Sequence, residues 1–462
     1  MKPLSIEQIT QACGGQLLSG DPSAMVSGGI STDTRSIPEE SLFVALIGER
    51  FDAHEFLAEA AKKAAAIMVS SAPEEPLDAA VILVEDTLIG LQRLAAWYRR
   101  QLDILVVGIT GSNGKTSTKD FTRSVLAQKF NTFATAGNLN NHIGVPLSIL
   151  SLKPEHEIAV IEMGMNHSGE IAPLCEIASP DFGIITNIGS AHIENLGTRD
   201  AIAEEKSALG RSLKDNGTLL VPAACDYAEY LSKRTPARTI FAGNCRGQVR
   251  AEGLRQGLDG CDFKLIIADQ EPIDVQLPIP GRHMVTNALL AAGIGSALGL
   301  SKEQIAAGLS EASISTGRLR RFTSRECTVI DDSYNANPES MAAALQTLAE
   351  CPVNGKGRRY AVLGHMAELG EVTLSAHQRI GRIAAQLELD TLITVGPEAH
   401  AIAEAALDQA GSTTILDFQK LEDAVAALEA RIRPGDTLLF KGSRAAAIER
   451  VMHQVFPEPD PA

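Results

Sequence analysis

The sequence predicts an α/β protein in which mostly parallel strands alternate with helices over several domains. Its 462 residues exceed what one hydrophobic core usually organises, so we expect two or three domains. Short β-branched runs recur along the chain, and helix-type sequence separates most of them. This alternation is typical of parallel strands joined by crossover helices. We place three regions at residues 1–85, 86–314 and 315–462.

The three regions differ in their strand patterns. The first alternates short strands, such as residues 42–46, with helical stretches, such as 53–66. A helical segment at 88–101 leads into the second region, whose runs are typical of strands buried on both faces and lie at 104–109, 158–161, 183–186 and 218–221. In the third region we expect strands at 329–330, 360–363, 392–395 and 437–440, with Ala-rich helices between them. No Gly-x-Gly-x-x-Gly follows these last strands, so the third region is not predicted to bind a dinucleotide.

Composition excludes several classes of protein. Apolar residues make up 45% and charged residues 21%, as in ordinary globular proteins. The formal charge of −16 argues against nucleic acid or an anionic membrane as a partner. The seven cysteines form no Cys-x-x-Cys pair, which indicates reduced thiols rather than disulfides or a zinc site. With no signal-type segment and no run of about eighteen apolar residues, we expect a cytoplasmic protein with no membrane partner, and a monomer.

A phosphate-binding loop follows the strand at 104–109. The motif is Gly108-Ile-Thr-Gly-Ser-Asn-Gly-Lys-Thr116, in which Ile109 replaces the first glycine of the standard P-loop. A strand that runs through a glycine-rich turn into a helix surrounds phosphate oxygens with backbone N–H groups. Lys115 is expected to reach the β- and γ-phosphates, and the Thr116 hydroxyl to bind magnesium. We predict nucleotide binding; a chance glycine-rich turn carrying a lysine is the weaker interpretation.

The P-loop alone does not distinguish ligases, kinases and GTPases, so further polar residues at strand ends matter. Glu162 ends a predicted strand, where an acid suits a magnesium ion shared with Thr116 or simply caps a helix. His192 follows another strand, and Lys206 lies fourteen residues later in a helical segment. On position alone, a structural histidine and a solvated lysine are the better interpretations of this pair.

Several motifs together resemble the Mur ligase family, which builds the peptide stem of bacterial peptidoglycan. They are the P-loop, Gly137-Asn-Leu-Asn-Asn-His-Ile-Gly-Val-Pro146, Glu162-Met-Gly164, Thr186-Asn-Ile-Gly-Ser-Ala-His-Ile-Glu194, Asp331-Asp-Ser-Tyr-Asn-Ala-Asn-Pro338 and Lys441-Gly-Ser-Arg444. Ser31-Thr-Asp-Thr-Arg-Ser36 and Phe51-Asp-Ala-His-Glu-Phe56 resemble the UDP-substrate domain of the branch that adds D-alanyl-D-alanine to UDP-N-acetylmuramoyl-tripeptide. The resemblance implies a small α/β UDP-substrate-binding domain (1–85), a central P-loop ATPase-like ligase domain (86–314) and a C-terminal Rossmann-like ligase domain (315–462).

The resemblance also implies a two-step ligation. ATP phosphorylates the terminal carboxylate of the tripeptide, and the amine of D-alanyl-D-alanine then attacks the acyl phosphate, giving the pentapeptide precursor. Lys115 and two magnesium ions would offset the repulsion between carboxylate and triphosphate. One ion would be held by Thr116 and Glu162. The other would be held by His192 and by Lys206 converted to a carbamate, which turns a cation into an oxygen ligand.

The remaining site residues are carried over from the family motifs. ATP would contact the P-loop, the helix that carries Asn287, and two third-domain residues, so that the nucleotide set is Gly111, Ser112, Asn113, Gly114, Lys115, Thr116, Ser117, Asn287, Arg318 and Asp332. Asp332 could instead be a turn residue. The substrates would contact Ser31, Thr34, Arg35, Asn138, Asn140, Lys441, Ser443 and Arg444. Arg35 could instead be a surface charge. The site would be complete only when the third domain closes on the second.

Three positions depart from the family pattern. His365 stands where the family usually has aspartate, and Ala53 stands where the first domain commonly has glycine. The segment Glu205-Lys-Ser-Ala208 lacks a glutamate often found two residues after the modified lysine. None of the three lies in the phosphate loop.

Alternative functions remain at this point. The diaminopimelate- or lysine-adding branch of the family is the nearest rival, but its Asp-Asn-Pro-Arg motif is absent here. Folylpolyglutamate synthetase shares the central fold but lacks the Thr-Asp-Thr-Arg segment. A P-loop switch or binding module that does not ligate is the alternative from another class.

Overall fold

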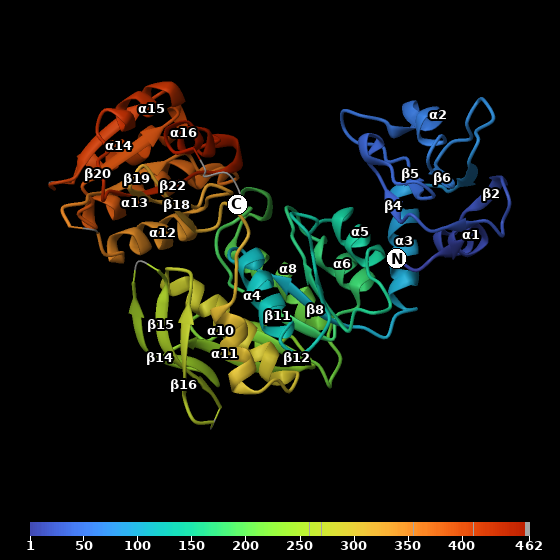
Figure 1. Cartoon of the computed structure of the whole chain (residues 1–462), viewed down its shortest axis with the longest axis horizontal. Coiled ribbons are helices and arrows are strands. Elements are labelled where there is room, and N and C mark those ends of the chain that lie inside the picture. The colour runs from blue at the N-terminus through green and yellow to red at the C-terminus, as the bar shows by residue number, and fades with distance from the viewer. Residues whose placement is uncertain (258, 269, 354, 410, 458–462) are drawn as a thin grey trace.

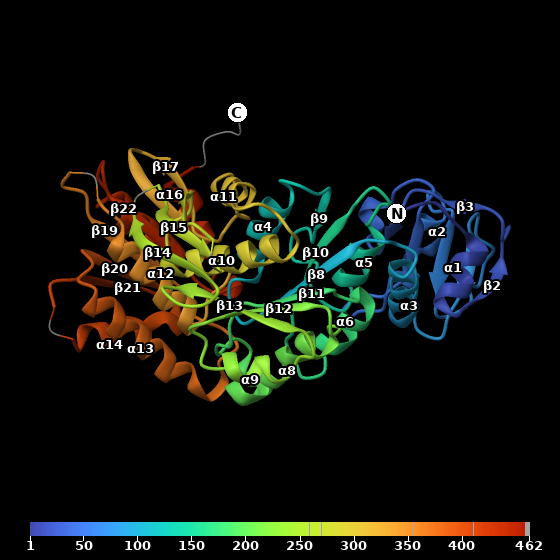
Figure 2. The same ribbon diagram turned by 90° about the horizontal axis from the view of Figure 1, so that it is seen from below.

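The computed structural model describes residues 1–257, 259–268, 270–353, 355–409 and 411–457. Within these residues the strands form four sheets, distributed over three lobes (Figure 1). The lobes follow one another along the long axis of the molecule in chain order, with the N-terminal lobe at one end (Figure 2). None of the helices in the described ranges is both long and apolar enough to cross a membrane.

The N-terminal lobe has a five-stranded sheet of order β2-β7-β6-β5-β4 and a small β1-β3 pair. Pairs among β4, β5, β6 and β7 are parallel, and β2 is antiparallel to β7. Its elements are β1 (Leu4–Ser5), α1 (Ile6–Cys13), β2 (Gln16–Ser19), β3 (Met25–Val26), β4 (Ile30–Ser31), η1 (Thr34–Ser36), β5 (Leu42–Val44), η2 (Ala53–Phe56), α2 (Leu57–Ala60), β6 (Ala66–Val69) and β7 (Ala80–Leu83). The helix predicted at 53–66 is therefore wrong in extent: η2 and α2 end at Ala60, and residue 66 already lies in β6.

Helix α3 (Thr87–Arg99) joins this lobe to the central one, as Figure 1 shows. Asp86 caps its N-terminus through Leu88 and Ile89 N–H groups. The helix packs on α1 on one side and on α5 and α6 on the other. Tyr98 strengthens the junction: its hydroxyl accepts the Lys2 N–H and donates to the Leu152 carbonyl.

The central lobe contains a nine-stranded sheet of order β16-β15-β14-β13-β12-β11-β8-β10-β9. Pairing is parallel from β9 through β14 and antiparallel for β14-β15 and β15-β16. Its elements are β8 (Leu105–Thr110), α4 (Lys115–Leu126), β9 (Thr132–Ala134), α5 (Gly144–Leu150), β10 (Ile158–Glu162), α6 (Ile171–Ala178), β11 (Phe182–Ile185), α7 (Ile193–Leu196), α8 (Arg199–Ser212), β12 (Thr218–Pro222), α9 (Ala228–Ser232), β13 (Arg238–Asn244), β14 (Val249–Gln256), β15 (Cys261–Ile267), β16 (Ile273–Leu277), α10 (Arg282–Ala297) and α11 (Lys302–Ser310).

The C-terminal lobe has a six-stranded sheet of order β17-β18-β22-β19-β20-β21, parallel except for edge strand β17. Its elements are β17 (Arg320–Ser324), β18 (Cys327–Asp331), α12 (Pro338–Glu350), β19 (Arg359–Leu363), η3 (Gly370–Val372), α13 (Thr373–Gln386), β20 (Thr391–Val395), η4 (Pro397–Ala399), α14 (His400–Leu407), β21 (Thr414–Phe418), α15 (Leu421–Glu429), β22 (Thr437–Lys441), η5 (Arg444–Ala446) and α16 (Glu449–Val455). Asn337 and Pro338 start α12 with a capping box, as an Asn-Pro pair predicts.

Buried apolar residues explain why the parallel strands were predictable. Strands β8, β10 and β12 carry almost continuous buried β-branched and leucine side chains, because helices cover both faces of their sheet. The apolar segment around Met284 forms the buried helix α10. The carboxyl ends of β8, β10 and β11 lie at one edge of the central sheet, and this edge carries the site.

Candidate active site

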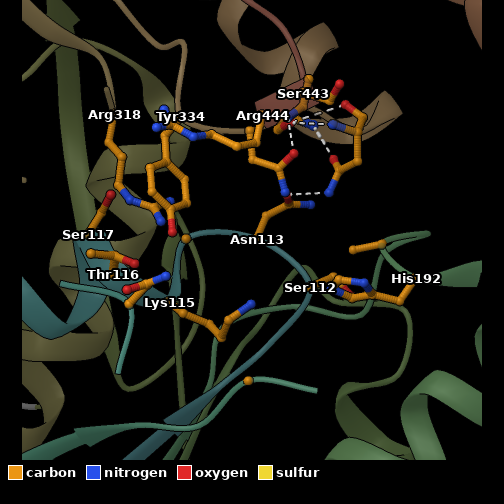
Figure 3. A pocket seen from close by; sticks show the side chains of 18 of the residues that line it. Ser112, Asn113, Lys115, Thr116, Ser117, His192, Arg318, Tyr334, Ser443 and Arg444 are labelled. Atoms are coloured by element: carbon orange, nitrogen blue, oxygen red, sulfur yellow. Dashed lines mark hydrogen bonds between the residues drawn. The ribbon is translucent and has the colours of Figure 1, made fainter. Parts of the chain in front are cut away.

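A cavity of about 720 Å³ lies between the central and C-terminal lobes, at the carboxyl edge of the central sheet. It gathers most of the residues predicted from sequence: Ser112, Asn113, Gly114, Lys115, Thr116, Ser117, Asn138, Asn140, Glu162, His192, Asn287, Arg318, Asp332, Lys441, Ser443 and Arg444. Gly111 and Lys206 lie behind this lining, and Ser31, Thr34 and Arg35 lie in the N-terminal lobe, away from it. Figure 3 shows Lys115, Thr116 and Ser117 at the start of α4, with Arg318 and Tyr334 above them and His192 entering from another side.

Two glycines allow the backbone of the P-loop to turn tightly. At Gly111 (φ 148°), a Cβ atom would lie 1.8 Å from the Thr186 hydroxyl oxygen. At Gly114 (φ 75°), it would lie 2.8 Å from the Asn287 amide of α10. Since no larger residue fits these backbone positions, the loop can wrap closely under a phosphate chain while α10 packs against it.

Lys115 is held at the floor of the loop. Its Nζ donates to the Gly111 carbonyl at 2.8 Å. Burial lowers the pKa of Lys115, the nearby Glu162 carboxylate opposes that shift, and Arg318 adds to it. The protein alone thus provides little negative charge to balance the Lys115 ammonium. Phosphate oxygens would supply it.

Glu162 ends β10 with one carboxylate oxygen engaged and one free. Asn140 Nδ2 donates to Oε1 at 2.8 Å, and the Glu162 N–H donates to the Thr135 hydroxyl at 3.0 Å. Oε2 is buried and has no hydrogen-bond partner among the described residues. An orphaned carboxylate oxygen and the Thr116 hydroxyl, which line the same cavity, are oxygen donors of the kind that suits a hard cation such as Mg²⁺.

Lys206 lies in α8 and is only 1% exposed. Burial lowers its pKa well below the ordinary lysine value, and the charge of Lys115 lowers it further. The preceding residue, Glu205, accepts hydrogen bonds from Gly169 and Ile171 N–H groups at 2.8 Å, which fixes this turn of α8. The described part of the chain contains no cluster of three or more His, Cys, Asp or Glu that could hold a metal. A second metal would therefore need oxygen donors from elsewhere, such as phosphate or a lysine carbamate.

The C-terminal lobe contributes a covering wall. The Arg318 guanidinium lies 4.2 Å from the centre of the Tyr334 ring. Asn337 Nδ2 donates to the Asn113 side chain of the P-loop at 2.6 Å (Figure 3), and Glu339 accepts from the Ser190 N–H and hydroxyl at 3.2 and 2.9 Å. Tyr334, Asn337 and Glu339 line the cavity but were not predicted as site residues. They belong to or directly follow the Asp331–Pro338 motif, which was the available signal.

Two predicted residues of this lobe are bound within it. Lys441 Nζ donates to Asp332 Oδ2 at 2.6 Å and to the Asn335 carbonyl at 3.0 Å. Burial raises the pKa of Asp332, although Lys441 opposes that shift. The pair fixes the loop after β18 and leaves the lysine fewer N–H groups for a substrate.

The structure accommodates two of the departures from the family pattern, His365 and Ala53. His365 places its ring 3.8 Å from Glu398, while its carbonyl accepts the Ser443 N–H at 2.9 Å, a contact that any residue can make. Ala53 begins η2 with a negative φ, so no glycine is required there.

The residues of the N-terminal lobe that were predicted to bind substrate form an open surface. Arg35 is 87% exposed along its side chain and makes two hydrogen bonds to Asp33, at 2.9 and 2.7 Å. The Ser31 hydroxyl accepts the Asp33 N–H at 3.1 Å, which holds the turn that carries Thr34.

Comparison with known proteins agrees with this geometry. Residues 109–295 match the family model of the Mur ligase middle domain, and residues 317–444 match that of the Mur ligase, glutamate ligase domain. The chain is 35% identical to the UDP-N-acetylmuramoyl-tripeptide–D-alanyl-D-alanine ligase of Bacillus subtilis, covering 98% of this chain and 99% of that protein. It is 37% identical to the Escherichia coli enzyme of the same name, over 98% of each chain.

Solved structures give the same result. A crystal structure of MurF from Acinetobacter baumannii superposes with a TM-score of 0.90 at 34% identity, covering 99% of this chain and 100% of that one. The MurF ligase of Thermotoga maritima in complex with ADP superposes with a TM-score of 0.82 at 30% identity, covering 92% of this chain and 96% of that one.

Proposed function

Because this chain belongs to the Mur ligase family, we propose an assignment of its residues to the steps of a peptide-bond ligation. The enzyme is an ATP-dependent, ADP-forming ligase that joins D-alanyl-D-alanine to UDP-N-acetylmuramoyl-tripeptide. The observation that carries the assignment is the single cavity in which the P-loop, Glu162 and the loop after β18 meet.

The reaction has two steps. The tripeptide carboxylate attacks the γ-phosphorus of ATP, the bond to the bridging oxygen breaks, and ADP leaves. The amine of the dipeptide then attacks the acyl phosphate carbon, loses a proton, and the C–O bond breaks to release inorganic phosphate. The product is the amide, UDP-N-acetylmuramoyl-pentapeptide.

The P-loop binds and orients the triphosphate. Backbone N–H groups around Gly111–Gly114 and the Lys115 ammonium neutralise charge that would otherwise repel the incoming carboxylate. Asn287, packed under Gly114, lines the adenine side. Arg318 and Tyr334 cover the nucleotide from the C-terminal lobe and help to exclude water, which would hydrolyse an acyl phosphate.

We propose that the site holds two magnesium ions, which when bound would supply positive charge to the transferring phosphoryl group. Thr116 and the free Oε2 of Glu162 would hold one ion. His192 and a Lys206 carbamate would hold the other. The carbamate is chemically reasonable because only a neutral amine adds to carbon dioxide, and burial favours the neutral form of Lys206.

The substrates would extend from the cavity to the N-terminal lobe. Ser31, Thr34 and Arg35 would bind the uridine diphosphate end, and Asn138 and Asn140 would lie near the muramoyl peptide. Lys441, Ser443 and Arg444 would face the reacting groups from the C-terminal lobe. We retain domain limits of 1–85, 86–314 and 315–462, which fall between the sheets. We also propose a monomeric, cytoplasmic enzyme with neither nucleic acid nor membrane as a partner.

The direct test is ATP-dependent phosphate release by the purified protein with UDP-N-acetylmuramoyl-tripeptide. D-alanyl-D-alanine is compared with single amino acids as acceptors, and the product is weighed by mass spectrometry. We expect release that requires the dipeptide and a product heavier by one dipeptide less water. Release driven by a single amino acid would favour the rival branch, and nucleotide binding without stimulated release would favour a non-ligating P-loop module.

A further inference from the structure

The loop that carries His192 is held between two lobes. On the central side, the Gly189 N–H donates to the Ser112 hydroxyl at 2.9 Å, and the Asn113 N–H donates to Asn187 Oδ1 at 2.8 Å. On the C-terminal side, Glu339 accepts the two hydrogen bonds from Ser190 described above. The position of His192 therefore depends on the C-terminal lobe as well as on the P-loop.

A second C-terminal carboxylate reaches His192 itself. Glu368 lies in the loop between β19 and η3, and its Oε2 is 2.5 Å from His192 Nδ1, although the two groups are not aligned as in an ideal hydrogen bond. The main chains also meet, since the Glu194 N–H donates to the Glu368 carbonyl at 3.4 Å. The loop approaches so closely that a Cβ atom at Gly370 would lie 3.2 Å from Glu194 Cγ.

Both residues of the contact adopt unusual backbone conformations. Glu368 has a φ of 60° and His192 a φ of 62°, in the left-handed region that side chains other than glycine, asparagine and aspartate rarely adopt. Such conformations persist where surrounding structure holds them, and they concentrate at functional sites. In this contact the His192 side chain is 17% exposed and the Glu368 side chain is 47% exposed.

Two of the four candidate metal-binding side chains, Glu162 and His192, are thus held in different ways. Glu162 receives its orienting hydrogen bond from Asn140 of its own lobe. His192 receives its orienting contact from Glu368 of the other lobe. A carboxylate at one imidazole nitrogen keeps the proton there and leaves the other nitrogen to bind a metal.

We propose that Glu368 is a positioning residue that reaches across the domain interface, keeps the proton of His192 on Nδ1, and presents Nε2 to the cavity. This inference rests on the metal-binding role proposed for His192. It adds that this half of the metal site is completed by the C-terminal lobe, so that tight metal binding and domain closure are one event. Glu162, by contrast, is oriented before closure.

The test uses the full-length protein with E368Q and E368D variants, and E371Q as the matched control. Glu371 is exposed and lies three residues further along the chain, in η3. Mn²⁺ is titrated in the presence of ADP and the free ion is measured by electron paramagnetic resonance. We expect the Mn²⁺ dissociation constant to rise roughly 10- to 100-fold in E368Q, with partial recovery in E368D, because loss of an orienting partner weakens a metal ligand by about that factor. E371Q should bind as the wild type does.

A metal-independent readout separates positioning from general damage. In protein labelled with ¹⁵N-histidine, with the His192 signal identified through H192Q, the wild type should show the Nδ1-protonated tautomer and E368Q a mixture. An unchanged tautomer together with unchanged Mn²⁺ affinity in E368Q would overturn the inference.

A double-mutant comparison with H192Q completes the design. If Glu368 acts through His192, E368Q adds no further loss of Mn²⁺ affinity in the H192Q background. A full additional loss would show instead that Glu368 contacts the ion, and would also overturn the positioning role. Should H192Q itself leave Mn²⁺ affinity unchanged while phosphate release still requires the dipeptide, the metal role of His192 fails and the ligase function stands.

Discussion

The end of the molecule that we propose binds the nucleotide is buried, whereas the end that we propose binds uridine diphosphate is exposed. At the nucleotide end, Thr116 and Glu162 are 4% and 2% exposed, and two lobes enclose the cavity. At the proposed uridine end, the Arg35 side chain is 87% exposed and pairs with the neighbouring Asp33, itself on the surface.

The difference follows from what each end must do. Phosphoryl transfer needs fixed charges in a site with little water, where electrostatic interactions are strong and no reorganisation is needed at the moment of reaction. Recognition of a substrate handle needs only enough favourable contact to bind, and it can be formed from exposed side chains as the ligand arrives. Substitutions at the first end should therefore change the rate, and those at the second should change the affinity.

The largest effect is expected for Lys115→Ala. Removing a buried ammonium aimed at the triphosphate should lower kcat by about 10³-fold or more. Dipeptide-dependent ADP formation measures this, with Lys153→Ala, an exposed lysine, as the control. Retention of a tenth of the wild-type rate would remove Lys115 from the transfer step.

Lys206→Ala comes next. Losing one donor to a metal should reduce activity by about 10²- to 10³-fold, and added formate or acetate should restore part of it by supplying a carboxylate in place of the carbamate. Exposed Lys214 provides the control substitution. Full activity of the variant without added acid would exclude Lys206 from the metal site.

A smaller effect, of another kind, is expected for Arg35→Ala. The KM for the UDP-tripeptide should rise about 10-fold, the equivalent of one charge-assisted hydrogen bond, with kcat unchanged. Steady-state kinetics measure both constants, and Lys62→Ala is the exposed control in the same lobe. A fall in kcat with KM unchanged would contradict the comparison, because it would place Arg35 in the chemistry.

The smallest effect concerns stability. Burial lowers the pKa of His283 to about 4, and Lys441 contributes in the same direction, whereas an unfolded histidine titrates near 6.5. As pH falls from 6.5 to 4, the unfolded chain takes up a proton that the folded protein resists, so the free energy of unfolding decreases by up to about 1.4 kcal/mol per pH unit.

His283→Asn should remove this contribution and flatten the pH dependence of stability by one proton between those values. Urea unfolding at several pH values measures the slope, with exposed His453→Asn as the control. Equal slopes in His283→Asn and the wild type would mean that His283 is protonated in the folded protein.

The parts of the fold that were predictable are those in which one residue pattern has one explanation. Buried β-branched runs gave β8, β10 and β12, since both faces of these strands are covered. The hairpins of β14, β15 and β16 were missed because one face is solvated, and the alternating pattern of residues such as Asp262 and Lys264 is weaker than a continuous apolar run.

The site divides in the same way. The P-loop could be predicted because one short segment contains its strand, turn and helix, so local sequence suffices. Glu368 could not, because its importance arises from a lobe interface that no local pattern describes. Tyr334 lies within the Asp331–Pro338 motif, but its contact with Arg318 is not visible in the local sequence. Lys206 was assigned only through the family resemblance, since a lysine in a helix has no distinguishing pattern of its own.

The hydrogen bond between Asn113 and Asn337 has a consequence for the order of events in turnover. It joins the P-loop of the central lobe to the residue that caps α12 of the C-terminal lobe. Opening of the two lobes must break it, so we expect it to form after ATP has bound and to separate before ADP leaves. Separation of the lobes would then set the time taken by each cycle. A substitution that loosens this contact, such as Asn337→Ala, should release ADP sooner, and water should hydrolyse more of the acyl phosphate.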